Sequence, residues 1–254
     1  MINQFKNRIK IGSKSIIIFI VIIFICIAVI KLISSFATKN IINSKDENTR
    51  ETLALSAIVN QDDYVVQRIN EKYRNSNIEV YYPTTKYEVL NKEVKIIIDS
   101  KISIFKESIK DNIEYSLFTN FDIYKYDNYI GFVFHVLEDY AGSHPNTFIF
   151  TVNYNIKDNY IINIDTLINK NNNILNLMSK YAYKNLSTNN KIKEINLPYM
   201  LKNGTKPIKT NFDNFVFTRD GMIVFFEKYQ IAPYTYGEFW ITIPYLDLNL
   251  KISD

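Results

Sequence analysis

The sequence predicts an α+β protein, in which an N-terminal transmembrane helix precedes antiparallel sheets with covering helices. Three observations favour this fold class. An uncharged apolar run occupies residues 15–30. Two later segments, residues 91–111 and 173–187, repeat apolar side chains at three- and four-residue steps, as amphipathic helices do. Much of the remaining chain alternates apolar and polar residues between short turns, which is typical of strands with one buried face.

The N-terminal segment predicts a membrane anchor. Residues 15–30 carry no charge, and apolar residues continue beyond Lys31 to Ala37. About 20 apolar residues cross the hydrocarbon layer of a membrane, and a long lysine side chain can reach the interface. Four cations precede the run, which places the N-terminus inside. We therefore expect a short basic cytoplasmic tail at residues 1–14 and a single-pass signal anchor at residues 15–37.

A second interpretation of this segment stays open. Ser35 and Ala37 occupy the positions that a signal peptidase reads, so cleavage after Ala37 would release the remainder of the chain. The apolar run is longer than that of a typical signal peptide, which favours a retained anchor. In both cases the folded region is expected to be extracytoplasmic.

Residues 38–62 are polar and charged, and predict a stalk between the anchor and the folded region. Six of the 30 Lys and Arg residues lie at or before position 39. The rest of the chain therefore has 24 basic and 26 acidic residues, a net charge of about −2. A nucleic-acid-binding domain needs a basic folded surface, so we expect no nucleic-acid partner. The single cysteine, Cys26, lies inside the apolar run, so the folded region has no thiol chemistry.

A first α+β lobe is expected at residues 63–165. The alternation in residues 77–84 predicts a strand, and residues 91–111 predict an amphipathic helix. Four further strands are predicted at residues 121–126, 129–139, 147–156 and 160–164. The connections between these four are too short for a parallel crossover, so their pairing is expected to be antiparallel.

A second α+β lobe is expected at residues 166–254. It begins with the helix at residues 173–187. Three strand segments follow at residues 212–218, 221–232 and 238–248. The order of a helix followed by antiparallel strands thus occurs twice. The sequence leaves open whether the chain forms two related lobes or one sheet with two covering helices.

Two stretches of the chain resemble the paired extracellular domains of the RsiV/PdaC type. Residues 132–159 (FVFHVLEDYAGSHPNTFIFTVNYNIKDN) carry a form of that family's hairpin motif. Residues 211–248 carry a more specific set: a Phe-x-x-Phe-x-hydrophobic-Thr-x-Asp-Gly strand pair, a Tyr-x-Ile-Ala-Pro-Tyr segment and an Ile-Pro-Tyr strand. Members of this family include the lysozyme-binding anti-sigma-V factor and the non-catalytic N-terminal region of a peptidoglycan deacetylase.

The resemblance implies the shared ectodomain without the effector parts of these relatives. About 14 residues precede the apolar run, fewer than the segment with which anti-sigma factors hold a sigma factor, so we expect no sigma-factor partner. The chain ends at Asp254, shortly after the second lobe, so we expect no deacetylase domain with its metal ligands. What remains implied is binding of a lysozyme-like protein or of peptidoglycan.

The residue pattern predicts neither catalysis nor a metal site. Four potential metal ligands lie within ten positions, namely His135, Glu138, Asp139 and His144. On an extended strand, however, Glu138 points away from the face that carries His135 and Asp139. Ser143 is adjacent to His144 in sequence, which does not set a base against a nucleophile. The chain also lacks a phosphate-binding or dinucleotide motif, so we expect no cofactor and no enzyme activity.

Binding through aromatic side chains is the better-supported role. Aromatic rings suit both sugar rings and the hot spots of protein interfaces. Two loops are expected at the surface, residues 141–146 (AGSHPN) and residues 233–237 (PYTYG). The candidate binding residues in and beside these loops are Gly142, Ser143, His144, Asn146, Tyr234, Tyr236 and Trp240.

These expectations combine into one functional hypothesis. The chain is interpreted as a membrane-anchored extracytoplasmic module of a Gram-positive bacterium that faces the cell wall. It would bind or sense a lysozyme-like protein or peptidoglycan. Two alternatives stay open: a structural or assembly partner of another envelope protein, and an unrecognised wall hydrolase.

The anchor hypothesis predicts that the protein stays with the membrane fraction after a carbonate wash. Release into the soluble fraction would contradict a retained anchor. If cleavage after Ala37 sheds the folded region, Ala37→Tyr should stop the shedding, because signal peptidase requires a small residue there. Unchanged shedding of the Ala37→Tyr variant, measured in the culture medium, would rule out this cleavage site.

Overall fold

The computed structural model of the chain describes residues 64–251. The predicted tail (1–14), anchor (15–37) and stalk (38–62), with the Ser35–Ala37 cleavage site, lie outside these residues. In the part of the chain that is described, no helix is both long and apolar enough to cross a membrane. All described residues belong to one compact unit.

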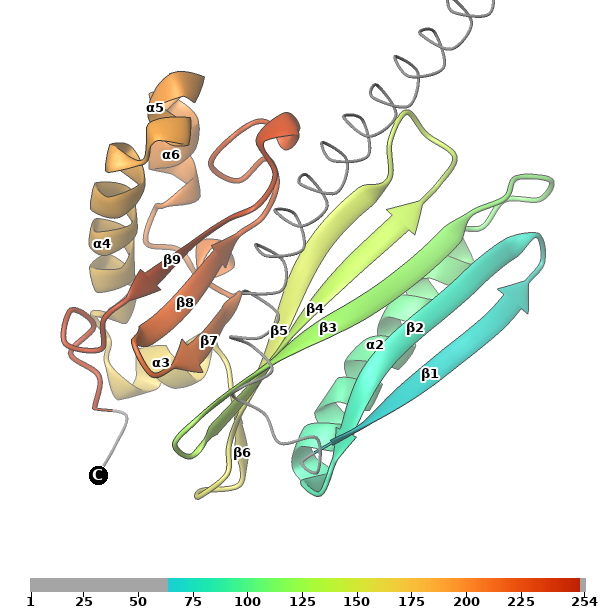
Figure 1. The fold of residues 1–254 in the computed structure, drawn as a ribbon, viewed down its shortest axis with the longest axis horizontal. Coiled ribbons are helices and arrows are strands. Elements are labelled where there is room, and N and C mark those ends of the chain that lie inside the picture. Colours follow the sequence, from blue (N-terminus) through green and yellow to red (C-terminus); the bar gives the residue numbers. More distant parts are fainter. Residues whose placement is uncertain (1–63, 252–254) are drawn as a thin grey trace, which may run out of the picture. The chain divides into compact units, whose positions relative to one another are not determined.

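The first half of this unit is a six-stranded sheet, sheet A, with strands in the order β1-β2-β3-β4-β5-β6 (Figure 1). The strands are β1 (Tyr64–Tyr73), β2 (Ser76–Thr85), β3 (Ser116–Tyr126), β4 (Tyr129–Asp139), β5 (Asn146–Asn155) and β6 (Tyr160–Ile162). The predicted antiparallel run from β3 to β6 is confirmed. Its two tight turns place Asp127 and Asn159 at positive φ, which Asp and Asn tolerate better than most residues.

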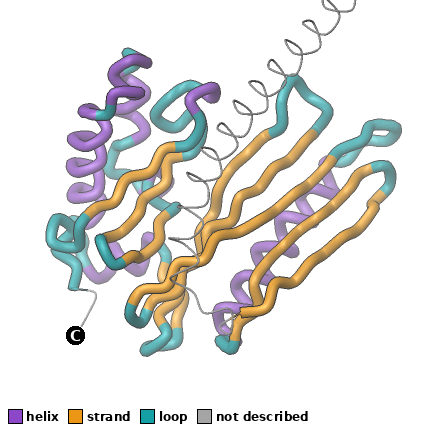
Figure 2. Tube along the Cα trace, viewed as in Figure 1, coloured by secondary structure: helices purple, strands orange, loops and turns teal. Residues whose placement is uncertain are grey.

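One pair of strands departs from the predicted antiparallel pattern. Strands β2 and β3 are parallel, with Asn77 opposite Ser116 and Val80 opposite Thr119. The helix α2 (Glu88–Ser108) connects them, because a parallel pair needs a long crossover rather than a tight turn. The predicted apolar stripe of α2 is confirmed: Val94, Ile98, Ile102 and Phe105 are all buried. Figure 2 shows α2 lying across one face of sheet A.

The second half contains a three-stranded antiparallel sheet, sheet B, with the order β7-β8-β9. Its strands are β7 (Phe215–Thr218), β8 (Gly221–Phe226) and β9 (Phe239–Ile243). The helical segments of this half are α3 (Ile164–Lys170), α4 (Ile174–Thr188), α5 (Asn190–Ile195), α6 (Pro198–Gly204), η2 (Lys209–Asn211) and η3 (Tyr234–Tyr236). The one-sheet alternative is therefore wrong, because the nine described strands divide between two sheets.

Two large hydrophobic cores stabilise the two halves. One lies between α2 and sheet A and includes Phe132 and Phe134 of β4. The other lies between sheet B and the helices and includes Met178 of α4 and Phe226 of β8. In each sheet one face thus packs on helices, as expected for an α+β protein.

A third, smaller apolar cluster joins the two sheets. Val133 and Ile149 of sheet A are fully or almost fully buried against Val216 of β7. The backbones approach closely here: a Cβ atom added at Gly131 would lie 2.8 Å from Cγ1 of Val216 and 2.7 Å from Oδ1 of Asn153. Glycine at position 131 is therefore required by the contact between the sheets.

Replacement of this glycine tests the contact. Gly131→Ala should lower the free energy of unfolding by about 1–3 kcal/mol, because an added methyl group overpacks a filled interface. Gly142→Ala is the matched control, since the nearest atom to its added Cβ is 3.9 Å away. Its effect should stay within about 0.5 kcal/mol. Urea unfolding measures both values, and equal stabilities of the two variants would contradict the close contact.

Candidate functional site

Two loops that are distant in sequence meet at one end of the two sheets. The β4–β5 loop carries His144, and the β8–β9 loop carries Tyr234 in η3 (Figure 1). Their rings stack with centroids 4.2 Å apart and an interplanar angle of 23°. The Tyr234 hydroxyl also donates a hydrogen bond to the carbonyl oxygen of Pro145, at 3.1 Å. We call this contact between His144, Pro145 and Tyr234 the loop junction.

Further side chains extend the aromatic surface of the loop junction. The Tyr229 ring lies 5.6 Å from the Tyr234 ring, centroid to centroid, and 60% of Tyr229 is exposed. The ammonium group of Lys228 sits 4.5 Å from the centroid of the Tyr234 ring, in a cation–π arrangement. The loop junction therefore presents ring faces, a cation and the exposed Tyr229 side chain close together.

Partly buried polar side chains fix the β8–β9 loop. The Ile149 amide donates to Oε1 of Glu227 at 3.1 Å, and the Asn214 side chain donates to the Ile149 carbonyl at 3.1 Å. Burial raises the pKa of Glu227, while the Ile149 hydrogen bond opposes this rise. Gln230 accepts a hydrogen bond from the Glu227 amide and donates to the carbonyls of Gly204 and Asn211.

Glu227 and Gln230 were not predicted from the sequence as part of a site. Their position was the signal available: Glu227 directly follows the apolar strand β8, and Gln230 lies three residues later in the tyrosine-containing β8–β9 loop. Polar side chains at such a place often satisfy the backbone groups of a neighbouring element. Their partner, β5, is revealed only by the docking of the two sheets.

The other predicted binding residues lie near the loop junction in sequence but do not join its ring contacts. Gly142, Ser143 and Asn146 are exposed in or beside the β4–β5 loop. Tyr236 ends η3 and is also exposed. Trp240 lies on the edge strand β9 with 61% of its surface exposed, and among the described residues it makes no ring contact.

The predicted loop histidine and the strand histidine have separate environments. Nε2 of His135 lies 2.9 Å from Oδ2 of Asp122 on the neighbouring strand β3, and this hydrogen bond raises the pKa of His135. Asp139 accepts a hydrogen bond from the Ala141 amide, and Glu138 accepts one from Tyr140. Within residues 64–251, no three His, Cys, Asp or Glu side chains gather as ligands for a metal ion.

A comparison with protein families finds a similarity within the second half of the chain. Residues 165–246 match the family described as "Protein of unknown function (DUF3298)". The matched segment is similar to this family over about a third of the chain. It contains Tyr234, Tyr236 and Trp240, whereas His144 precedes it.

A curated relative extends the similarity into the first half. The chain is 26% identical over 179 residues to the peptidoglycan-N-acetylmuramic acid deacetylase PdaC of Bacillus subtilis (strain 168). The match covers 66% of this chain but only 37% of that protein. The predicted resemblance to the PdaC-type region is thereby confirmed, and the relation to anti-sigma factors stays a prediction.

Two solved structures share the fold. A DUF3298 family protein from Pseudomonas aeruginosa PAO1 superimposes with a TM-score of 0.50 at 11% identity, over 74% of this chain and 91% of that one. A DUF3298 family member from Bacteroides fragilis NCTC 9343 gives 0.50 at 15% identity, over 74% and 92%. Both overlaps are wider than residues 165–246, so the shared fold includes both sheets.

The His135–Asp122 pair predicts a pH-dependent contribution to stability. The folded-state pKa of His135 lies above its ordinary value, so the pair stabilises fully below about pH 6.5 and loses this effect as pH rises through the raised pKa. Asp122→Asn should therefore destabilise more at about pH 5.5 than at about pH 8.5. The difference should be small and salt-sensitive, because both side chains are half-exposed.

Urea unfolding at the two pH values measures this difference. Asp99→Asn is the control, since Asp99 forms an ion pair with Lys95 and no histidine takes part in that pair. A pH-independent effect of Asp122→Asn, equal to that of the control, would contradict the linkage.

Proposed function

We propose that residues 64–251 form a non-catalytic binding module that faces the cell wall and contacts peptidoglycan through the loop junction. The observation that carries this proposal is the stacked pair of His144 and Tyr234, which joins the two loops that the sequence analysis selected independently. The similarity to part of a peptidoglycan deacetylase supports peptidoglycan as the polymer. The deacetylase activity belongs to the whole relative, of which this chain matches only 37%.

The chemistry of the loop junction suits a wall glycan. Sugar rings present apolar C–H faces that pack on aromatic rings, and Tyr229 offers an exposed ring for such packing. Ser143 and Asn146, exposed beside the rings, can hydrogen-bond hydroxyl and acetamido groups. Lys228 supplies a cation for the carboxylates of the peptide stems.

The geometry around His144 favours binding over catalysis. Its ring is stacked on Tyr234, and its Nδ1 lies 3.2 Å from the Pro145 carbonyl oxygen, so that nitrogen is directed at the backbone. A general base would need its other nitrogen, Nε2, aimed at a nucleophile, and no side chain of the described residues forms a hydrogen bond with Nε2 of His144. We accordingly place His144 in recognition rather than in hydrolysis.

The proposal includes the membrane tether. An anchor at residues 15–37 followed by a stalk at residues 38–62 would hold the module on the outer side of the membrane, beside the wall. The absence of cysteine after Cys26 fits an extracytoplasmic domain that needs no reducing environment.

A lysozyme-like protein is a second candidate ligand, favoured by Trp240. This side chain is 61% exposed on β9, which is an edge strand of sheet B. Exposed tryptophan is enriched at protein-interface hot spots, and an unpaired strand edge can accept a strand of a partner. A role in assembling another envelope protein would use the same surface.

Co-sedimentation with sacculi tests the glycan proposal. The full-length protein in mild detergent should bind sacculi that have been stripped of phosphate polymers. Tyr234→Ala should weaken this binding about threefold to tenfold, as expected for the loss of an aromatic stacking contact. Tyr199→Ala is the matched control, because Tyr199 is 63% exposed on α6 and makes no ring contact with either loop within the described residues, and it should leave binding unchanged.

Two outcomes would contradict peptidoglycan binding at the loop junction. Equal binding by Tyr234→Ala and Tyr199→Ala would remove the loop junction from the interface. Capture of lysozyme that is lost in Trp240→Ala, without any binding to sacculi, would favour the protein ligand instead.

A further inference from the structure

The helical surface of the second half is strongly basic. Residues 174–211 contain seven lysines and a single acidic residue, Glu194, which is a net charge of +6. The other described residues carry 15 cations and 19 acidic residues. The positive charge is thus concentrated on α4, α5, α6 and the segment that follows them. The seven lysines are Lys180, Lys184, Lys191, Lys193, Lys202, Lys206 and Lys209.

Most of this charge is uncompensated within the described structure. All seven lysines are exposed. Lys209 pairs with Asp165, and the other six make no ion pair within residues 64–251. Like charges gathered on a small surface raise the local potential and attract anions. A surface that keeps six such cations unpaired has a suitable charge for a multivalent anionic partner.

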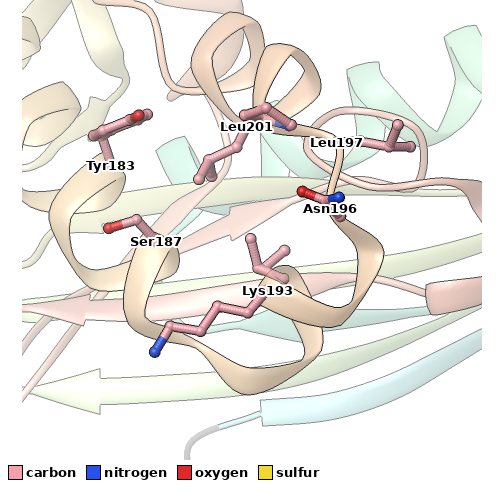
Figure 3. A pocket seen from close by; sticks show the side chains of 8 residues that line it. Tyr183, Ser187, Lys193, Asn196, Leu197 and Leu201 are labelled. Carbon is pink, nitrogen blue, oxygen red and sulfur yellow. The ribbon is translucent and has the colours of Figure 1, made fainter.

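A pocket opens in the same surface where α4, α5 and α6 meet. Its volume is about 240 Å³, and it is lined by Tyr183, Ser187, Ile192, Lys193, Asn196, Leu197, Pro198 and Leu201. Ile192 and Leu201 are buried, while Tyr183, Lys193 and Asn196 are exposed. Figure 3 shows Tyr183 and Ser187 projecting from one helix and Leu201 from another, with Lys193 and Asn196 on the third side.

The composition of the pocket favours a small polyhydroxylated unit. Apolar side chains and the Tyr183 ring provide contact area, and the Ser187 hydroxyl, the Asn196 amide and the Lys193 ammonium provide hydrogen bonds. Its volume suits one sugar or polyol unit rather than a longer segment. The unpaired lysines around it extend over three helices, further than one such unit reaches.

We propose that the α4–α6 surface binds a polyol-phosphate polymer of the cell wall, with one polyol or sugar unit in the pocket and successive phosphates on the lysines. A repeating phosphate chain matches both the pocket and the spread of unpaired cations. A flat lipid surface would meet the lysines but would leave the pocket unused. The proposal shares the wall-facing location with the proposed function but depends on different residues.

The decisive experiment compares two charge-reversal variants of the full-length protein in mild detergent. Lys180→Glu/Lys184→Glu/Lys193→Glu changes the proposed surface. Lys72→Glu/Lys92→Glu/Lys110→Glu makes the same charge change at exposed lysines of β1, of α2 and of the loop that follows α2. The probes are wall fragments that retain their polyol-phosphate polymer and the same fragments after acid has removed it.

The proposal predicts a specific loss of binding. The first variant should bind polymer-bearing fragments at least about tenfold more weakly at low salt and lose most of its salt dependence, because the interaction is ionic. The second variant should bind nearly as the unchanged protein does. Tyr183→Ala should also weaken binding, but with an unchanged salt dependence, since the pocket contact is not ionic. Lys→Gln at positions 180, 184 and 193 should give an intermediate loss, which guards against a folding defect.

The outcomes separate this proposal from peptidoglycan binding at the loop junction. Tyr234→Ala should weaken binding to stripped fragments, whereas the α4–α6 variants should not. Equal losses in both charge-reversal variants, or binding that acid treatment leaves unchanged, would overturn the proposal. So would a loss seen only with vesicles of phosphatidylglycerol and phosphatidylcholine, which would assign the surface to the membrane.

Discussion

The position of sheet B against sheet A depends on how the backbone hydrogen-bonding groups at one edge of β5 find partners. Strand β6 pairs with β5 only from Asn153 to Asn155, so the outer edge of β5 at Ile149 has no strand beside it. The Ile149 amide and carbonyl instead bond to Glu227 and Asn214 of the second half. Because Ile149 is almost fully buried, loss of these partners would cost roughly 1–3 kcal/mol for each unsatisfied group. This requirement holds sheet B against sheet A in one position.

The contact between the sheets is therefore directional as well as apolar. Only Val133, Ile149 and Val216 form its buried apolar cluster, whereas Asn153 donates to the Phe215 carbonyl at 2.7 Å. Oδ1 of Asn153 lacks a hydrogen-bond partner within the described residues, which costs free energy. The hydrogen bond from the same side chain to β7 offsets part of this cost. Near the β3–β4 turn, Tyr129 packs on Phe217 with ring centroids 4.6 Å apart. With sheet B held in this position, the β4–β5 and β8–β9 loops meet at the opposite end.

This dependence explains which features could be predicted from the sequence. Local patterns were sufficient for α2, α4 and the β3–β6 meander, because each has an apolar period or a turn residue of its own. Strand β1 lacked such a pattern, since Val65 is 63% exposed and its neighbour Val66 is also exposed. Helices α3, α5 and α6 span only six or seven residues, too few for a repeated apolar stripe. The two binding loops were recognisable as surface loops, but their meeting depends on Glu227 and Asn214, which act between elements that are distant in sequence.

The distribution of charge shows a similar limit of sequence averages. The chain after the anchor is close to neutral overall. If its charges were spread evenly over the surface, this near-neutrality would argue against a polyanionic partner. The charge is not spread evenly: residues 174–211 carry seven lysines and one acidic residue, whereas the other described residues carry 15 cations and 19 acidic residues. Because electrostatic attraction fades over about one Debye length, roughly 8–10 Å at physiological salt, a ligand senses the face that it touches rather than the net charge. A nearly neutral domain can therefore present an aromatic surface with a single cation at one site and a strongly basic surface at another.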